Sequence, residues 1–125
     1  MARFWIKFGS ILAGLSVMLG AFGAHSLKDR LTEKSLDTFH TAQFYQFMHS
    51  IALVLVGFLI LKLGEDASKR LHKAGWFFTA GIVLFSGSLY GLALGGPRFL
   101  GPMTPIGGLC FMTGWFLLAF SIPKK

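Results

Sequence analysis

The sequence predicts an all-α integral membrane protein with four transmembrane helices in an up-down antiparallel bundle. The first observation is composition, because 54% of the 125 residues are hydrophobic and only 14% are charged, against roughly 25% charged residues in soluble domains. The second is that the charges leave four uncharged stretches of 20, 24, 24 and 25 residues. About 20 helical residues cross a ~30 Å hydrocarbon core, so each stretch is long enough to span a membrane.

The predicted spans form a single four-helix transmembrane domain over residues 1–125. They lie at about 4–24, 38–61, 74–94 and 104–122. Strands are disfavoured because the apolar runs are too long and lack strict alternation. Glycines spaced along the first span favour a packing helix over a cleaved signal peptide.

The chain between the spans carries recognisable helix ends. Residues 26–29 have the form of a capping box, which predicts a short helix lying at the interface in the first outer loop. Thr32 or Ser35 is placed to cap the second helix. In the fourth helix, Thr104 is the expected N-cap and Pro105 the expected first helical residue.

Loop charge predicts the orientation. Eight Lys and Arg residues belong to the termini and the second loop, and four to the first and third loops. The positive-inside rule therefore predicts a multi-pass protein of the cytoplasmic (inner) membrane with both termini in the cytoplasm. The net charge of +7 is then mainly a topology signal. We expect no nucleic-acid partner, since no basic helix with interleaved aromatic residues is present.

Small residues recur at helical spacing on two spans, and such stripes let another backbone approach closely. The expected packing positions are Gly9, Ala13 and Gly20 on the first span and Gly87, Gly91 and Gly95 on the third. We therefore expect membrane lipids as partners, together with a homo-oligomer or a partner membrane protein. Trp5, Trp76 and Trp115 fall near the predicted interfaces, where tryptophan acts as an anchor.

Polar residues from all four spans fall at one level in the outer half of the predicted bundle. These residues are His25, Gln43, Gln46, His49, Ser86, Ser88, Tyr90 and Thr104. An unpaired imidazole or amide at this depth would cost several kcal/mol, so we expect these groups to face the bundle and find partners.

Two interpretations of the polar level compete. In the first, the groups only join helices, and the chain is a non-enzymatic membrane protein with a structural or accessory role. In the second, His25, Gln46 and His49 form an outward-facing pocket of a small transporter or a lipid or small-molecule binder. In that version His49 exchanges a proton or bonds a ligand headgroup, Gln46 orients it, and Tyr90 closes the site.

Other function classes lack the residues they need. The sequence has no Ser-His-Asp set, nucleophile elbow or phosphate loop, so we predict no catalytic residues and no cofactor. No carboxylate or thiol accompanies His25, His40 and His49 at a ligand spacing, so no metal site is predicted. No acidic residue lies inside a span, which disfavours a proton-coupled cation exporter.

Several motifs also resemble one known family in order along the chain. They are Gly20-Ala21-Phe22-Gly23-Ala24-His25, Tyr45-Gln46-x-x-His49, Leu84-Phe85-Ser86-Gly87-Ser88-Leu89-Tyr90, Thr104-Pro105-Ile106-Gly107-Gly108 and Gly114-Trp115. The family is the small bacterial inner-membrane family filed as domain of unknown function number 423, whose animal relatives are called transmembrane protein 256. The resemblance implies a four-helix protein of the cytoplasmic membrane and no established activity. Ser26 departs from the small apolar residue expected there.

Overall fold

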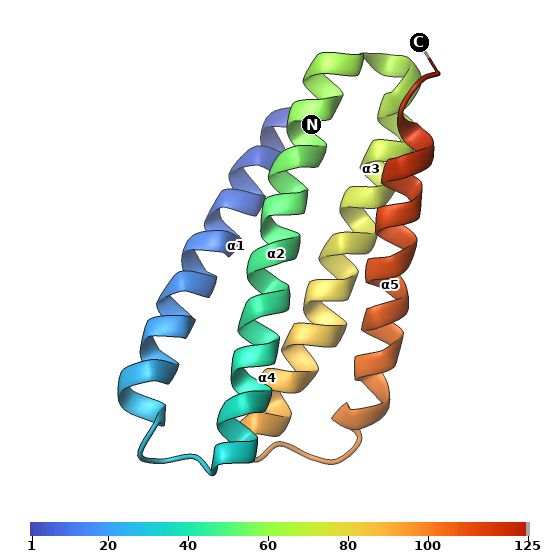
Figure 1. Cartoon of the computed structure of the whole chain (residues 1–125). Helices are drawn as coiled ribbons and strands as arrows, with labels where there is room; N and C mark the ends of the chain where they lie inside the picture. The colour runs from blue at the N-terminus through green and yellow to red at the C-terminus, as the bar shows by residue number, and fades with distance from the viewer. Residues whose placement is uncertain (125) are drawn as a thin grey trace.

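The computed structural model describes residues 1–124, apart from the side chain of Glu65, and in this part of the chain the regular elements are helical (Figure 1). The elements in chain order are α1 (Ala2–Phe22), the π-helical turn η1 (Gly23–Leu27), α2 (Glu33–Leu63), α3 (Glu65–Gly81), the π-helical turn η2 (Ile82–Ser86), α4 (Gly87–Ala93) and α5 (Leu100–Ser121).

These elements join into four helical rods that are long and apolar enough to cross a membrane. They are Ala2–Leu27, Glu33–Leu63, Asp66–Ala93 and Leu100–Ser121. The predicted four-helix fold is therefore confirmed. The second and third rods begin earlier than the predicted spans because charged residues at their starts continue the helix. The fourth rod begins at the uncharged Leu100, before the predicted start of its span.

Two predicted helix ends differ from the structure. Residues 26–29 do not start a separate interfacial helix, because Ser26 continues the first rod in η1 and the chain then turns through Lys28–Arg30. The fourth helix begins at Leu100, so Thr104 and Pro105 lie inside it and Thr104 is not its N-cap. The predicted cap of the second helix is confirmed, since the Ser35 N–H donates to Thr32 Oγ1 at 3.1 Å.

The helices are arranged as a curved row in which α1 packs on α2, α2 packs on the α3–α4 rod, and that rod packs on α5 (Figure 1). Successive rods are antiparallel, so both chain ends lie at the same end of the molecule. Within the described residues, α2 and α5 make at most marginal backbone contact. Side chains therefore have to fill the space between these two helices.

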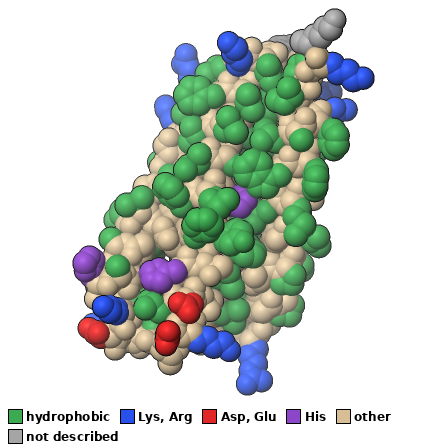
Figure 2. All heavy atoms as spheres, viewed as in Figure 1, with side chains coloured by type: hydrophobic (Ala, Val, Ile, Leu, Met, Phe, Trp, Pro, Cys, Tyr) green, Lys and Arg blue, Asp and Glu red, His purple; other side chains and the backbone are tan. Residues whose placement is uncertain are grey.

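The core lies between α2, α3 and the N-terminal half of α1. Trp5, Leu53, Val56, Leu71 and Phe78 are completely or almost completely buried there. The Trp5 indole N–H donates to His72 Nδ1 at 2.9 Å, which ties the start of α1 to α3. Large apolar side chains are exposed along the middle of the rods, while Lys, Arg, Asp and Glu gather at the two ends (Figure 2). An apolar middle with charged ends is the pattern of a protein surrounded by the hydrocarbon core of a membrane.

Glycines bring the helices close, although not all at the expected positions. A Cβ added at Gly9 would lie 2.6 Å from the Ser50 carbonyl oxygen. A Cβ added at Gly20 would lie 3.1 Å from the Gln43 amide nitrogen, and one added at Gly91 would lie 2.5 Å from Leu100 Cδ1. The structure differs at Gly87, which is exposed, and at Gly95, which has a φ of 89° in the turn after α4. Ala13 is half-buried.

The difference on the third rod has a physical cause. The helix ends at Ala93, so Gly95 falls in the turn that follows it. Gly87 and Gly91 lie four residues apart on α4 and share a face, but the Leu100 side chain packs against Gly91 at the end of α4 and not against Gly87. Gly81, Gly107 and Gly114 make close approaches that the small-residue stripes did not predict. A Cβ added at Gly81 would meet the Phe111 ring. One added at Gly107 would meet the Phe85 backbone, and one added at Gly114 would meet the Phe78 ring.

Candidate functional site: a polar layer between the helices

The polar layer begins where α1 meets α2. Ser16 is completely buried, and its hydroxyl donates to the Gln43 carbonyl oxygen at 2.9 Å. In return, Gln43 Nε2 donates to the Ser16 carbonyl oxygen at 3.1 Å. This reciprocal pair uses the Ser16 hydroxyl and the Gln43 amide nitrogen to hold α1 against α2.

Gln46 joins three helices. Its Nε2 donates to the Leu12 carbonyl oxygen of α1 at 2.9 Å, and its Oε1 accepts the Tyr90 hydroxyl of α4 at 2.6 Å. The Tyr90 ring packs edge-on against Phe39 with a centroid separation of 5.2 Å. Gln46 is 5% exposed, so both ends of its amide are used inside the protein.

His49 uses both ring nitrogens. Trp115 Nε1 lies 3.0 Å from His49 Nε2, and His49 Nδ1 lies 2.8 Å from the Tyr45 carbonyl oxygen. An indole N–H can only donate, so Nε2 must accept and the proton must reside on Nδ1. The imidazole is therefore neutral in this arrangement. It stacks on the Phe111 ring at a centroid separation of 3.6 Å.

The α4–α5 contact contains the remaining polar groups. The hydroxyls of Ser88 and Thr104 lie 2.5 Å apart and join the two helices. Ser86 is 1% exposed, and its hydroxyl makes no hydrogen bond with the described part of the chain. It lies at the end of η2, where the carbonyl four residues before it, that of Ile82, accepts the Gly87 N–H.

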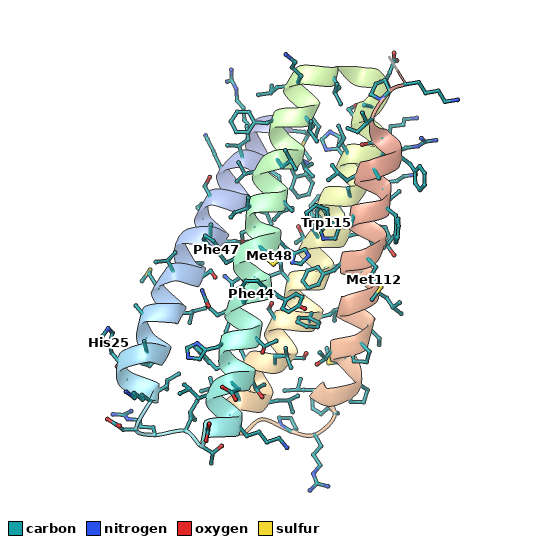
Figure 3. All side chains as sticks on the ribbon, viewed as in Figure 1. His25, Phe44, Phe47, Met48, Met112 and Trp115 are labelled. Atoms are coloured by element: carbon teal, nitrogen blue, oxygen red, sulfur yellow. The ribbon has the colours of Figure 1, made fainter. Side chains whose placement is uncertain are left out.

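His25 lies apart from this layer. It is exposed at the end of the first rod and points away from the other helices (Figure 3). The other seven predicted residues lie between helices, but they form separate contacts rather than the lining of one pocket. The structure thus does not bring His25, Gln46 and His49 into a common outward-facing cavity.

Ser16 and Trp115 belong to the layer but were not among the predicted site residues. The predicted role of Trp115 was interfacial anchoring. The available signal was its depth. A tryptophan well inside a span requires an acceptor for its N–H, and His49 is an acceptor expected to face the bundle.

Two apolar grooves lie on either side of α2. One, of about 290 Å³, lies between α2 and α5, where Met48, Met112 and Trp115 are seen in Figure 3, and His49 is part of its lining. Its lining is Tyr45, Met48, His49, Phe85, Gly108, Phe111, Met112 and Trp115. The second, of about 380 Å³, lies against α1 and includes Gln46. Among the described residues, no group of three or more His, Cys, Asp or Glu side chains is placed to hold a metal ion.

Comparison with known proteins gives the family. The family described as protein of unknown function DUF423 matches residues 19–108. The UPF0382 membrane protein YwdK of Bacillus subtilis is 42% identical over 122 residues, covering 98% of this chain and 98% of the relative. A UPF0382 membrane protein of Staphylococcus haemolyticus is 40% identical over 98% of this chain and 97% of its own.

No solved structure matches the chain. The relatives are named only as membrane proteins, which agrees with the four apolar rods. The chain belongs to the DUF423 family of membrane proteins of unknown function.

Proposed function

We propose that this chain is a non-enzymatic protein of the cytoplasmic membrane with a structural or accessory role, and that both termini face the cytoplasm. The observation that carries the proposal is the bonding of His49, which gives one nitrogen to Trp115 and the other to the Tyr45 carbonyl oxygen. A proton carrier or a headgroup ligand would need one of these nitrogens.

The neighbouring polar groups support the same role. The amide of Gln46 is bonded to α1 and to Tyr90, and Ser88 is bonded to Thr104. Each contact joins two helices, and an interhelical hydrogen bond in a membrane contributes about 0.6–2 kcal/mol to stability. The hydrogen bonds of the polar layer therefore hold neighbouring helices together and set the distances between them.

The row arrangement leaves surface for partners. α1 packs mainly on α2, and its side chains Ile11, Met18 and Phe22 are exposed. Lipids cover such a surface in a monomer, and a second copy or another membrane protein covers it in an assembly. An accessory subunit requires surface of this kind.

Native mass spectrometry of the protein released from membrane-derived nanodiscs tests the proposal. Wild type and His49→Ala should give the same stoichiometry and only exchangeable bulk lipid, and His49→Ala should have a lower melting temperature. A defined small-molecule adduct that is present on the wild type and absent from a well-folded His49→Ala would contradict the structural role.

A second candidate is a binder of a lipid-soluble molecule in the α2–α5 groove, favoured by its volume and by the His49 edge in its lining. Gly108→Leu provides the test, since a Cβ at Gly108 meets only Phe85 Cδ2, at 3.9 Å, and a longer side chain would fill the groove. Loss of a bound molecule with unchanged melting temperature would support the binder. Unchanged mass spectra for wild type and Gly108→Leu would exclude it.

A further inference from the structure

A third cavity lies at the end of the molecule that carries both chain ends. Its volume is about 520 Å³, within the range of small-molecule sites. It lies between the first turns of α3 and the end of α5. The lining consists of Asp66, Ala67, Arg70, Phe120, Ser121, Ile122, Pro123 and Lys124.

Arg70 is held in a fixed place on this cavity. Its Nη1 donates to the Phe120 carbonyl oxygen at 2.7 Å, which satisfies a carbonyl in the last turn of α5. A guanidinium has five N–H donors in a planar fork, so the remaining donors are available to the cavity. This geometry suits a phosphate, because a guanidinium can present two parallel N–H groups to its oxygens.

The charges that line the cavity favour an anion with a polar attachment. Arg70 and Lys124 contribute two positive charges, and Asp66 contributes one negative charge. A phosphodiester between the two cations would be attracted to both. The Asp66 carboxylate can accept a hydrogen bond from a hydroxyl group attached to that phosphate.

The apolar part of the lining continues into the surface that faces lipid. Phe120 is 71% exposed and Ile122 is 47% exposed. Phe116, one turn before Phe120 on the same helix face, is 65% exposed. A chain of methylene groups leaving the cavity would therefore pass along an apolar face of α5.

We infer that this cavity binds an anionic phospholipid of the phosphatidylglycerol type. The phosphate lies between Arg70 and Lys124, a headgroup hydroxyl donates to Asp66, and one acyl chain follows Phe120 and Phe116. The cavity shares no residue with the polar layer, so the inference goes beyond the proposed structural role and stands independently of it.

Titration of the full-length protein in detergent with dioleoyl phosphatidylglycerol and dioleoyl phosphatidylcholine, read by native mass spectrometry, tests the inference. Wild type should bind phosphatidylglycerol at least about fivefold more tightly, because each nearby Lys or Arg contributes roughly that factor toward an anionic lipid. Arg70→Gln and Lys124→Gln should each reduce this preference about fivefold. Lys73→Gln is the control, since it removes the same charge from α3 at a position outside the lining.

Lys124→Gln is the deciding variant, because Arg70→Gln also removes the hydrogen bond to Phe120. An equal loss for Lys73→Gln would show diffuse surface charge in place of a site, and equal binding of the two lipids would overturn the inference outright. Glycerol phosphate competing as well as the lipid would point to a soluble phosphate ligand. Tighter binding of phosphatidylethanolamine, abolished by Asp66→Asn, would replace the anionic lipid by a zwitterionic one.

Discussion

Trp115 donates its indole N–H to His49 Nε2 across 3.0 Å, and this bond joins α5 to α2 where the two backbones barely touch. The indole cannot accept, so the bond also fixes the imidazole as a neutral ring with its proton on Nδ1. One contact thus sets both the helix spacing and the protonation form of the most deeply placed histidine.

A double-mutant cycle measures this contact. His49→Phe keeps a ring to stack on Phe111, and Trp115→Phe keeps an apolar ring in the groove, so each removes mainly the hydrogen bond. We expect a coupling of about 0.6–2 kcal/mol in the free energy of unfolding, the range for interhelical bonds in membranes. Circular dichroism during unfolding in mixed detergent and dodecyl sulfate micelles provides the measurement. Additive single effects would show that the bond does not couple the helices.

Tyr90→Phe should lower the free energy of unfolding by about 0.6–2 kcal/mol, because Gln46 Oε1 loses the Tyr90 hydroxyl while the ring contact with Phe39 remains. The same unfolding assay measures it. Tyr45→Phe is the matched control, since the Tyr45 ring packs on Phe85 and its hydroxyl has no hydrogen bond among the described residues. Equal losses in the two variants would contradict the assigned link between α2 and α4.

Two glycines on α1 give opposite expectations. Gly9→Ala should destabilise by about 1–3 kcal/mol, because the new methyl group would lie 2.6 Å from the Ser50 carbonyl oxygen and push α1 from α2. Gly14→Ala should be neutral or stabilising by up to ~1 kcal/mol, since the position is open and alanine favours the helix. Melting temperatures of the two purified variants compare them, and a stable Gly9→Ala would disprove the close α1–α2 approach.

Thiol labelling tests the proposed orientation. With Cys110 replaced by Ala, Lys28→Cys in intact cells should react with a membrane-impermeant reagent, and Lys69→Cys should react only after the membrane is opened. Both positions are exposed on the protein surface, so a difference in labelling would reflect the side of the membrane and not burial in the protein. The reverse pattern of labelling would place the termini outside.

The fold was predictable because it depends on composition and spacing alone. Four uncharged stretches require four membrane-length helices wherever their side chains point. The pairing of Trp115 with His49 was not predictable, because the residues are 66 positions apart and helix rotation decides which faces meet. His25 was assigned to the layer by depth alone, and depth does not distinguish the outer side of α1 from its inner side.

The π-helical turn Ile82–Ser86 sets the rotation of the last part of the third rod. A π-helical turn accommodates one extra residue, and each residue of an α-helix advances the rotation by about 100°. If the same residues formed an unbroken α-helix, everything beyond the turn would rotate by about that angle, Tyr90 would leave Gln46, and Ser88 would leave Thr104. With one residue fewer, an unbroken α-helix would return both side chains to about their present rotation. A single-residue deletion in this turn should therefore lower the free energy of unfolding less than a single-residue insertion between Ser86 and Gly87, which would break both contacts at once and cost more than Tyr90→Phe.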